Sequence, residues 1–202
     1  MKTPDFYNRV PTITLFDPLS DFLGSFEKGE ITYGYHDAVK LAGHSCPTVA
    51  GAYLMTLRAL EALYGDQMPR RGDIRIEMLG RQDEGATGVI AQVMTLITGA
   101  AGEGGFKGIA RLFERRGLLE FGKSVGAEAR FTRQDTQKSV GVSYDPGFVP
   151  ASPEQSVLMR RILSGNAGEE EKRNFGTLWQ SRVKAILCDY IDDERLIKIQ
   201  HL

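Results

Sequence analysis

The residues with the clearest chemical potential are a histidine and a cysteine two positions apart, in the segment Gly43-His44-Ser45-Cys46-Pro47. Pro47 suits the first position of a helix, because its missing N–H group would have no partner there in any case. That placement makes Cys46 the N-cap residue, beside the unpaired N–H groups and the positive end of the helix dipole. Such surroundings favour the thiolate, the form of cysteine that binds metals and attacks electrophiles. We therefore predict that His44 and Cys46 bind a metal, and Cys46 is also a candidate catalytic nucleophile.

A third metal ligand is predicted at His36, upstream of His44. The chain has three histidines, and the remaining one, His201, lies near the C-terminus, so nitrogen donors are scarce. If residues 36–43 are helical, His36 lies about two turns before His44 and can swing to the same side. A surface or capping histidine is the alternative. Imidazole and thiolate ligands suit zinc, with iron, nickel and a haem as the other options.

A second candidate site is the segment Arg81-Gln82-Asp83-Glu84-Gly85, which follows a predicted strand and precedes a predicted helix. A carboxylate at such a junction can act as a general base or can orient a metal-binding histidine. Asp83 is therefore the candidate catalytic carboxylate. Capping of the following helix by negative charge is the more common role of such residues.

The glycine-rich stretch 99–108 contains the third candidate, Lys107. The stretch has no Walker-type spacing and no glycine fingerprint after a strand, so it does not predict nucleotide binding. Its functional interpretation is a mobile lid in which Lys107 contacts an anionic group of a cofactor or small-molecule ligand. A plain flexible loop is the alternative.

Composition places the chain among ordinary globular proteins. Its 202 residues are 42% hydrophobic and 25% charged, and they are enough for one well-packed core. A formal net charge of -1 gives no reason to expect a nucleic acid or an anionic membrane as partner. Cys46 and Cys188 stand far apart, which predicts no disulfide and favours a reducing compartment. Without a signal-peptide pattern or a membrane-spanning apolar run, the predicted location is the cytoplasm.

The pattern of the chain predicts an α+β fold in which a mixed or antiparallel sheet packs with helices. Residues 1–30 are predicted to be an irregular arm that wraps over the core or over a neighbouring subunit. Residues 31–150 are the core domain, and residues 151–202 are a helical extension of it. The sequence pattern predicts helices over 35–42, 47–64, 86–98 and 169–190, and strands over 72–78, 127–132 and 139–144. A further helix is predicted to start at 153, because Ser152, Pro153 and Gln155 are typical N-terminal capping residues. Residues 109–119 fit either a short helix or a strand.

The motif Gly43-His44-x-Cys46-Pro47, followed by Gly51-x-Tyr53 in the same helix, resembles the FmdE family, which takes its name from a component of formylmethanofuran dehydrogenase. Its members usually carry a pattern like FHGHxCPG followed by GY. The resemblance covers residues 30–145. It implies an α+β core domain, frequently dimeric, with a metal site around the His-x-Cys motif. The molybdenum-dependent chemistry of that dehydrogenase belongs to its other components, so the resemblance implies no particular activity.

Several positions depart from the family pattern. Ala42 replaces the first histidine of FHGH, and in this interpretation His36 takes over its role as a ligand. Thr48 replaces the glycine after the proline. The other departures are Thr87 and Ile90, where the family often has a cysteine and an aspartate, and Ala100, where a further cysteine is common. The C-terminal zinc finger of some members is absent, because the last quarter of the chain has no CxxC motif.

These observations lead to three functional hypotheses. The first is an FmdE-like metal-binding protein, in which an open coordination position activates water or binds a small anionic or one-carbon substrate. The second is a metal- or cofactor-carrying accessory protein without turnover. The third is a structural dimeric module in which Cys46 is only a packed thiol. A homodimer is predicted in each case, because residues 1–30 and the final helix carry more apolar surface than one chain is expected to bury.

Overall fold

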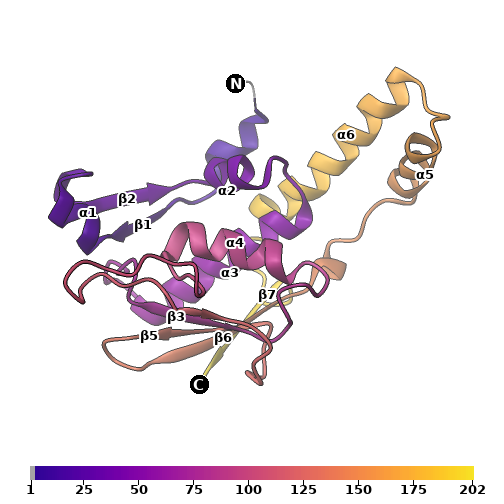
Figure 1. Cartoon of the computed structure of the whole chain (residues 1–202). Coiled ribbons are helices and arrows are strands. Elements are labelled where there is room, and N and C mark those ends of the chain that lie inside the picture. The colour runs from indigo at the N-terminus through magenta and orange to yellow at the C-terminus, as the bar shows by residue number, and fades with distance from the viewer. Residues whose placement is uncertain (1–2) are drawn as a thin grey trace.

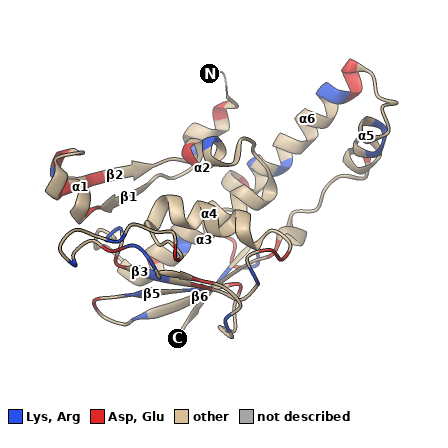
Figure 2. Cartoon of the chain, viewed as in Figure 1, with Lys and Arg blue, Asp and Glu red and all other residues tan. Residues whose placement is uncertain are grey.

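The structure is a computed structural model that describes residues 3–202. Within these residues the fold is α+β, with six α-helices, a five-stranded mixed sheet and a two-stranded antiparallel sheet (Figure 1). The predicted fold class is confirmed. Charged residues of both signs are spread along the chain, with none on the central helix α4 (Thr87–Thr98) (Figure 2). No helix in this part of the chain is both long and apolar enough to cross a bilayer.

The main sheet has the strand order β4-β3-β5-β6-β7. Its strands are β3 (Ile74–Met78), β4 (Leu119–Glu120), β5 (Ala129–Arg133), β6 (Ser139–Tyr144) and β7 (Ile197–His201). Neighbours are antiparallel, except that β4 runs parallel to β3. On one face Ile76 lies opposite Phe131, which pairs with Val140, and all three are buried. On the other face Arg130 pairs with Glu77 at 2.6 Å, so the alternation of side chains gives one apolar and one polar face.

The core is built around α3 (Pro47–Tyr64), which lies on the apolar face of the sheet. Fourteen of its 18 residues are buried, as expected of a helix that is apolar around its whole circumference. It contacts α4, α2 (Tyr35–Ala42), β6 and β7. Both predicted ends of α3 are confirmed: Pro47 is its first residue and Gly65 follows its last. The start of this helix is where the candidate metal ligands lie.

The predicted N-terminal arm contains regular elements. They are a 3₁₀ helix (Asp5–Arg9), β1 (Ile13–Phe16), α1 (Pro18–Leu23), a second 3₁₀ turn (Glu27–Gly29) and β2 (Glu30–Tyr33), which pairs with β1. Pro18 does not break the chain as expected, because it occupies the first position of α1 behind the N-cap Asp17. The segment packs on its own core through the buried side chains of Tyr7, Val10 and Leu15.

The C-terminal segment is partly helical, as predicted. The helices α5 (Pro153–Leu163) and α6 (Glu169–Lys184) form a hairpin that projects from the body of the molecule (Figure 1). A π-helical turn, Ala185–Asp189, then leads back to β7 at the edge of the main sheet. The predicted helical extension therefore ends in a strand of the main sheet. This strand, β7, is held in place by antiparallel pairing with β6, from Tyr144 opposite Ile197 to Val140 opposite His201.

Candidate functional site

His44 lies on the surface in the loop between α2 and α3, and its ring orientation is defined by the backbone. Gly43 ends α2 with a φ of 75°, a conformation that glycine adopts without strain. The chain then turns so that His44 Nδ1 lies 2.9 Å from the carbonyl oxygen of Ala42. Because a carbonyl oxygen can only accept, Nδ1 carries the proton. In the neutral form of such a ring the lone pair is on Nε2, which is the arrangement of a metal-binding histidine.

Cys46 is the N-cap of α3, as the sequence predicts. Its Sγ accepts a hydrogen bond from the backbone N–H of Val49 at 3.4 Å. The side chain points inward, and the residue is 8% exposed. The motif thus places an outward imidazole and an inward sulfur on either side of Ser45.

Four side chains from three other elements hold this loop, and sequence reasoning did not identify their role. Trp179 Nε1 and Gln180 Nε2 of α6 both donate to the carbonyl oxygen of Ser45, at 2.9 and 3.2 Å. The hydroxyl of Tyr35 lies 2.9 Å from Ser45 Oγ. The hydroxyl of Tyr144, at the end of β6, donates to the carbonyl oxygen of Pro47 at 3.0 Å. Contacts from α2, α6 and β6 thus preorganise the loop that carries both candidate ligands.

The surroundings of the loop keep these phenols neutral. Burial raises the pKa of both Tyr35 and Tyr144 above the ordinary range, so each stays a hydrogen-bond donor at neutral pH. Burial also raises the pKa of Glu128, whose Oε2 accepts the backbone N–H of Tyr144 at 3.2 Å. Glu128 lines a 630 Å³ pocket together with Thr87 and Ile90, the two positions where the FmdE pattern often has a cysteine and an aspartate. Glu128 is a titratable group that the sequence analysis missed, since a single acid just before a strand gives no local signal.

His36 has different neighbours from those predicted. Its Nε2 lies 2.9 Å from Thr3 Oγ1, and its ring packs edge-on against Tyr7 with centroids 5.1 Å apart. Among residues 3–202, no three His, Cys, Asp or Glu side chains come together in a way that could hold a metal ion. The structure therefore does not assemble His36, His44 and Cys46 into one three-ligand cluster within a single chain.

Asp83 lies on the surface. Its side chain is 76% exposed, and its carboxylate pairs with Arg81 at 3.2 Å in the loop before α4. The alternative capping role also fails for this residue, because the N-cap of α4 is Ala86 and no side chain caps it. No hydrogen bond or ion pair in the described part of the chain links Asp83 to His44 or Cys46.

Lys107 is exposed in the loop that follows α4. Its neighbour Phe106 lines a pocket beside Arg115, but Lys107 itself does not line that pocket. Residues 109–118, for which the sequence left helix and strand open, are a loop with one isolated bridge between Ile109 and Leu112. The strand β4 begins only at Leu119.

Comparison with protein-family models gives no match to this chain, and comparison with curated proteins gives none either. Its function is therefore inferred from the geometry of the α2–α3 loop and from the sequence motif that this loop carries.

Proposed function

We propose that the chain is an FmdE-like metal-binding protein whose protein ligands are His44 Nε2 and Cys46 Sγ. The observation that carries this proposal is the hydrogen bond between His44 Nδ1 and the Ala42 carbonyl, which leaves Nε2 of an exposed histidine free, two residues before a helix-capping sulfur. An imidazole and a thiolate suit a borderline-soft divalent ion, and zinc is the best fit. The FmdE-type motif supports the same assignment.

Two donors are fewer than the three or four protein ligands of most zinc sites. The remaining positions would be filled by water, by a small anionic ligand or by a second copy of the chain. A metal held in this way would polarise a bound water or carbonyl group as a Lewis acid. The chain's own contribution is to hold the loop rigid through Tyr35, Tyr144 and Trp179. A carrier that holds the metal without turnover is compatible with the same geometry.

The test is metal content in variants of the two ligands. Zinc per chain is measured by mass spectrometry after purification from zinc-supplemented medium, and cobalt titration reports thiolate coordination by its charge-transfer absorption. We expect His44→Ala and Cys46→Ser each to weaken binding at least about tenfold, because each removes a direct ligand. Serine is a favoured N-cap residue, so Cys46→Ser keeps the helix start. The His201→Ala/Cys188→Ser double variant is the matched control and should bind normally.

The same titration decides the role of His36. If His36→Ala binds like the unmodified protein, the site has two protein ligands per chain. A protein that takes up neither zinc nor cobalt overturns the proposal. It would leave the structural alternative, which the inward orientation and low exposure of Cys46 favour.

We further propose that the chain is a homodimer. The projecting α5–α6 hairpin exposes Val157 and Leu163, which are 46% and 80% exposed in one chain. Phe175 and Trp179 of α6 pack on each other, yet neither is fully buried. An isologous contact would cover these side chains and could bring further ligands to the metal site.

Light scattering coupled to gel filtration should give about twice the 22.3 kDa mass of one chain. Both exposed positions can be changed without disturbing the monomer, so Val157→Asp/Leu163→Asp is expected to yield a folded monomer. Thr177→Asp, which adds charge at an exposed polar position of α6, is the control and should remain dimeric. A monomer for the unmodified protein at micromolar concentration contradicts the proposal.

A further inference from the structure

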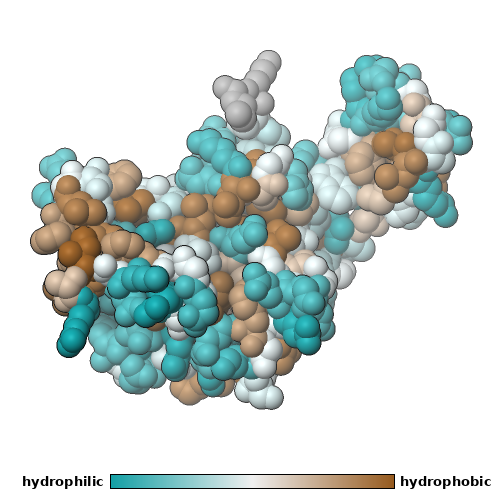
Figure 3. All heavy atoms as spheres, in the orientation of Figure 1, coloured by the Kyte–Doolittle hydropathy of each residue, from teal (hydrophilic) through white to brown (hydrophobic). Residues whose placement is uncertain are grey.

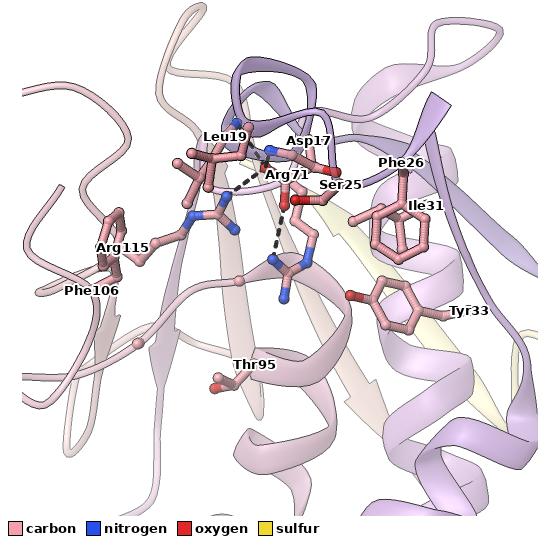
Figure 4. A pocket seen from close by; sticks show the side chains of 14 residues that line it. Asp17, Leu19, Ser25, Phe26, Ile31, Tyr33, Arg71, Thr95, Phe106 and Arg115 are labelled. Carbon is pink, nitrogen blue, oxygen red and sulfur yellow. Dashed lines mark hydrogen bonds and ion pairs between the residues drawn. The ribbon is translucent and has the colours of Figure 1, made fainter. Parts of the chain in front are cut away.

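A second pocket lies at the other end of α4, away from the α2–α3 loop. It encloses about 480 Å³ between α1, β2, the C-terminal end of α4 and the loop that follows (Figure 4). Thr95 of α4 and Gly99, the C-cap of this helix, line it, whereas Thr87 at the start of α4 lines the pocket near Glu128. The pocket is within the size range of sites for small organic molecules.

One carboxylate and two guanidinium groups meet at the wall of this pocket. Asp17 Oδ2 lies 3.0 Å from Arg71 Nη1, and Asp17 Oδ1 lies 2.7 Å from Arg115 Nη2. The Asp17 and Arg115 side chains are 4% and 7% exposed. Asp17 Oδ1 also accepts the backbone N–H groups of Leu19 and Ser20, so this oxygen accepts three hydrogen bonds, and Oδ2 accepts one from Arg71. The cluster is left with one net positive charge in a largely buried place.

Several donors of this cluster have no partner among residues 3–202. Arg115 makes one side-chain hydrogen bond, to Asp17, and its Nε and Nη1 make none. The hydroxyl of Ser20, a 6% exposed residue that lines the pocket, is buried without any hydrogen bond. The hydroxyl of Tyr33 points toward the Arg71 guanidinium across the pocket (Figure 4). Burial raises the pKa of Tyr33, so this hydroxyl stays protonated at neutral pH.

Apolar side chains that are open to solvent flank the charged cluster, with Phe106 on one side of it and Phe26 on the other (Figure 4). Leu23, Phe26 and Phe106 line the pocket and are 57%, 53% and 43% exposed. Apolar side chains gather at this end of the molecule around α1 (Figure 3). Exposed aromatic and aliphatic side chains beside a buried positive group are typical of a site for a molecule with one charged and one apolar part.

We propose that this pocket binds a small organic carboxylate with an apolar or aromatic body. The carboxylate would accept hydrogen bonds from Arg71, Arg115 and Tyr33, because guanidinium groups match its planar geometry. The apolar body would lie against the exposed ring of Phe26, on the Tyr33 side of the pocket (Figure 4). A single negative charge balances the net charge of the cluster, whereas a phosphate dianion would leave an excess charge in a poorly solvated place.

The probe is 3-phenylpropanoate, and binding is measured by calorimetry and ligand-observed NMR on metal-free protein. Three comparison compounds separate the parts of the site: 3-phenylpropanol lacks the charge, acetate lacks the apolar body, and phenyl phosphate tests a dianion. We expect the carboxylate to bind at least about tenfold more tightly than each of them, as for charge-assisted hydrogen bonds combined with apolar contact. Comparable binding of the alcohol, or tighter binding of phenyl phosphate, overturns the proposal.

Two exposed phenylalanines of the same segment supply a matched pair of variants. Phe26 lines the pocket, whereas Phe22 packs on Phe113 and does not line it. Phe26→Ala should weaken the binding of 3-phenylpropanoate several-fold, and Phe22→Ala should leave its binding unchanged.

The tyrosine hydroxyl is tested separately. Tyr33→Phe should weaken binding of 3-phenylpropanoate but not of 3-phenylpropanol, because the substitution removes only the hydroxyl that would donate to the carboxylate. Equal effects of the two phenylalanine variants, or no saturable binding by the unmodified protein, contradict the assignment. The outcome does not depend on metal binding at His44 and Cys46.

Discussion

Replacing Asp17 with alanine is expected to destabilise the protein by about 3–5 kcal/mol, because it leaves two partly buried arginines without their shared carboxylate. Arg71 would keep its bonds to the carbonyl oxygens of Leu96 and Ile97, but Arg115 would lose the one side-chain partner it has among residues 3–202. The same change removes the N-cap of α1. Urea unfolding followed by circular dichroism gives the free energy of unfolding. Asp145→Ala, which removes an exposed cap without a buried arginine, should cost only about 1 kcal/mol. A loss for Asp17→Ala no larger than for this control contradicts the prediction.

The effect of Asp17 should also depend on pH. Burial by itself raises the pKa of this carboxyl, but the Ser20 N–H and the two guanidinium groups outweigh it and leave the pKa below the usual 3.8. A carboxyl whose pKa is lower in the folded state stabilises the protein fully above its unfolded pKa. The contribution disappears as the pH falls through the folded value. The stability difference between the unmodified protein and Asp17→Ala should therefore be constant near neutrality and shrink below about pH 4. A difference that does not change with acidification contradicts this assignment.

Gly51→Ala is expected to destabilise the protein by about 1–3 kcal/mol, although alanine is the better helix former. A Cβ atom at this position of α3 would lie 2.7 Å from Cζ of Tyr144 and closer still to two other ring carbons. The ring cannot move freely, because its hydroxyl is bonded to the carbonyl oxygen of Pro47. Glycine at this position thus lets β6 reach the loop that carries His44 and Cys46.

A double-mutant cycle checks this cause. In a Tyr144→Ala background the clash is absent, so Gly51→Ala should change sign and stabilise the protein by about 0.5–1 kcal/mol. Thermal and urea unfolding of the four proteins measures the interaction. Zinc uptake by Gly51→Ala reports whether the displaced ring also disturbs the candidate ligands. Additive effects of the two substitutions would exclude contact between Gly51 and Tyr144 as the cause.

Local features of the chain were sufficient to predict the start of the candidate site. Pro47 and Gly65 delimit α3, and Cys46 is its N-cap, because helix termini depend on neighbouring residues alone. The strand over 139–144 is confirmed at both ends, since alternation with period two is also a local signal. The metal-binding role of His44 and Cys46 remains a prediction.

Contacts between distant parts of the chain were decided by the tertiary structure. Trp179 reaches Ser45 across 134 positions, and Arg115 reaches Asp17 across 98. Hydrophobic periodicity says which side of an element is buried, but not which element covers it. Pro18 in isolation likewise indicates a break, whereas with Asp17 at the N-cap it begins a helix. The sequence by itself therefore determined the α+β fold class and the helix start that carries His44 and Cys46. Only the packing of α2, α6 and β6 decided how that helix start is held, because side chains this far apart in the chain meet only when the whole core has formed.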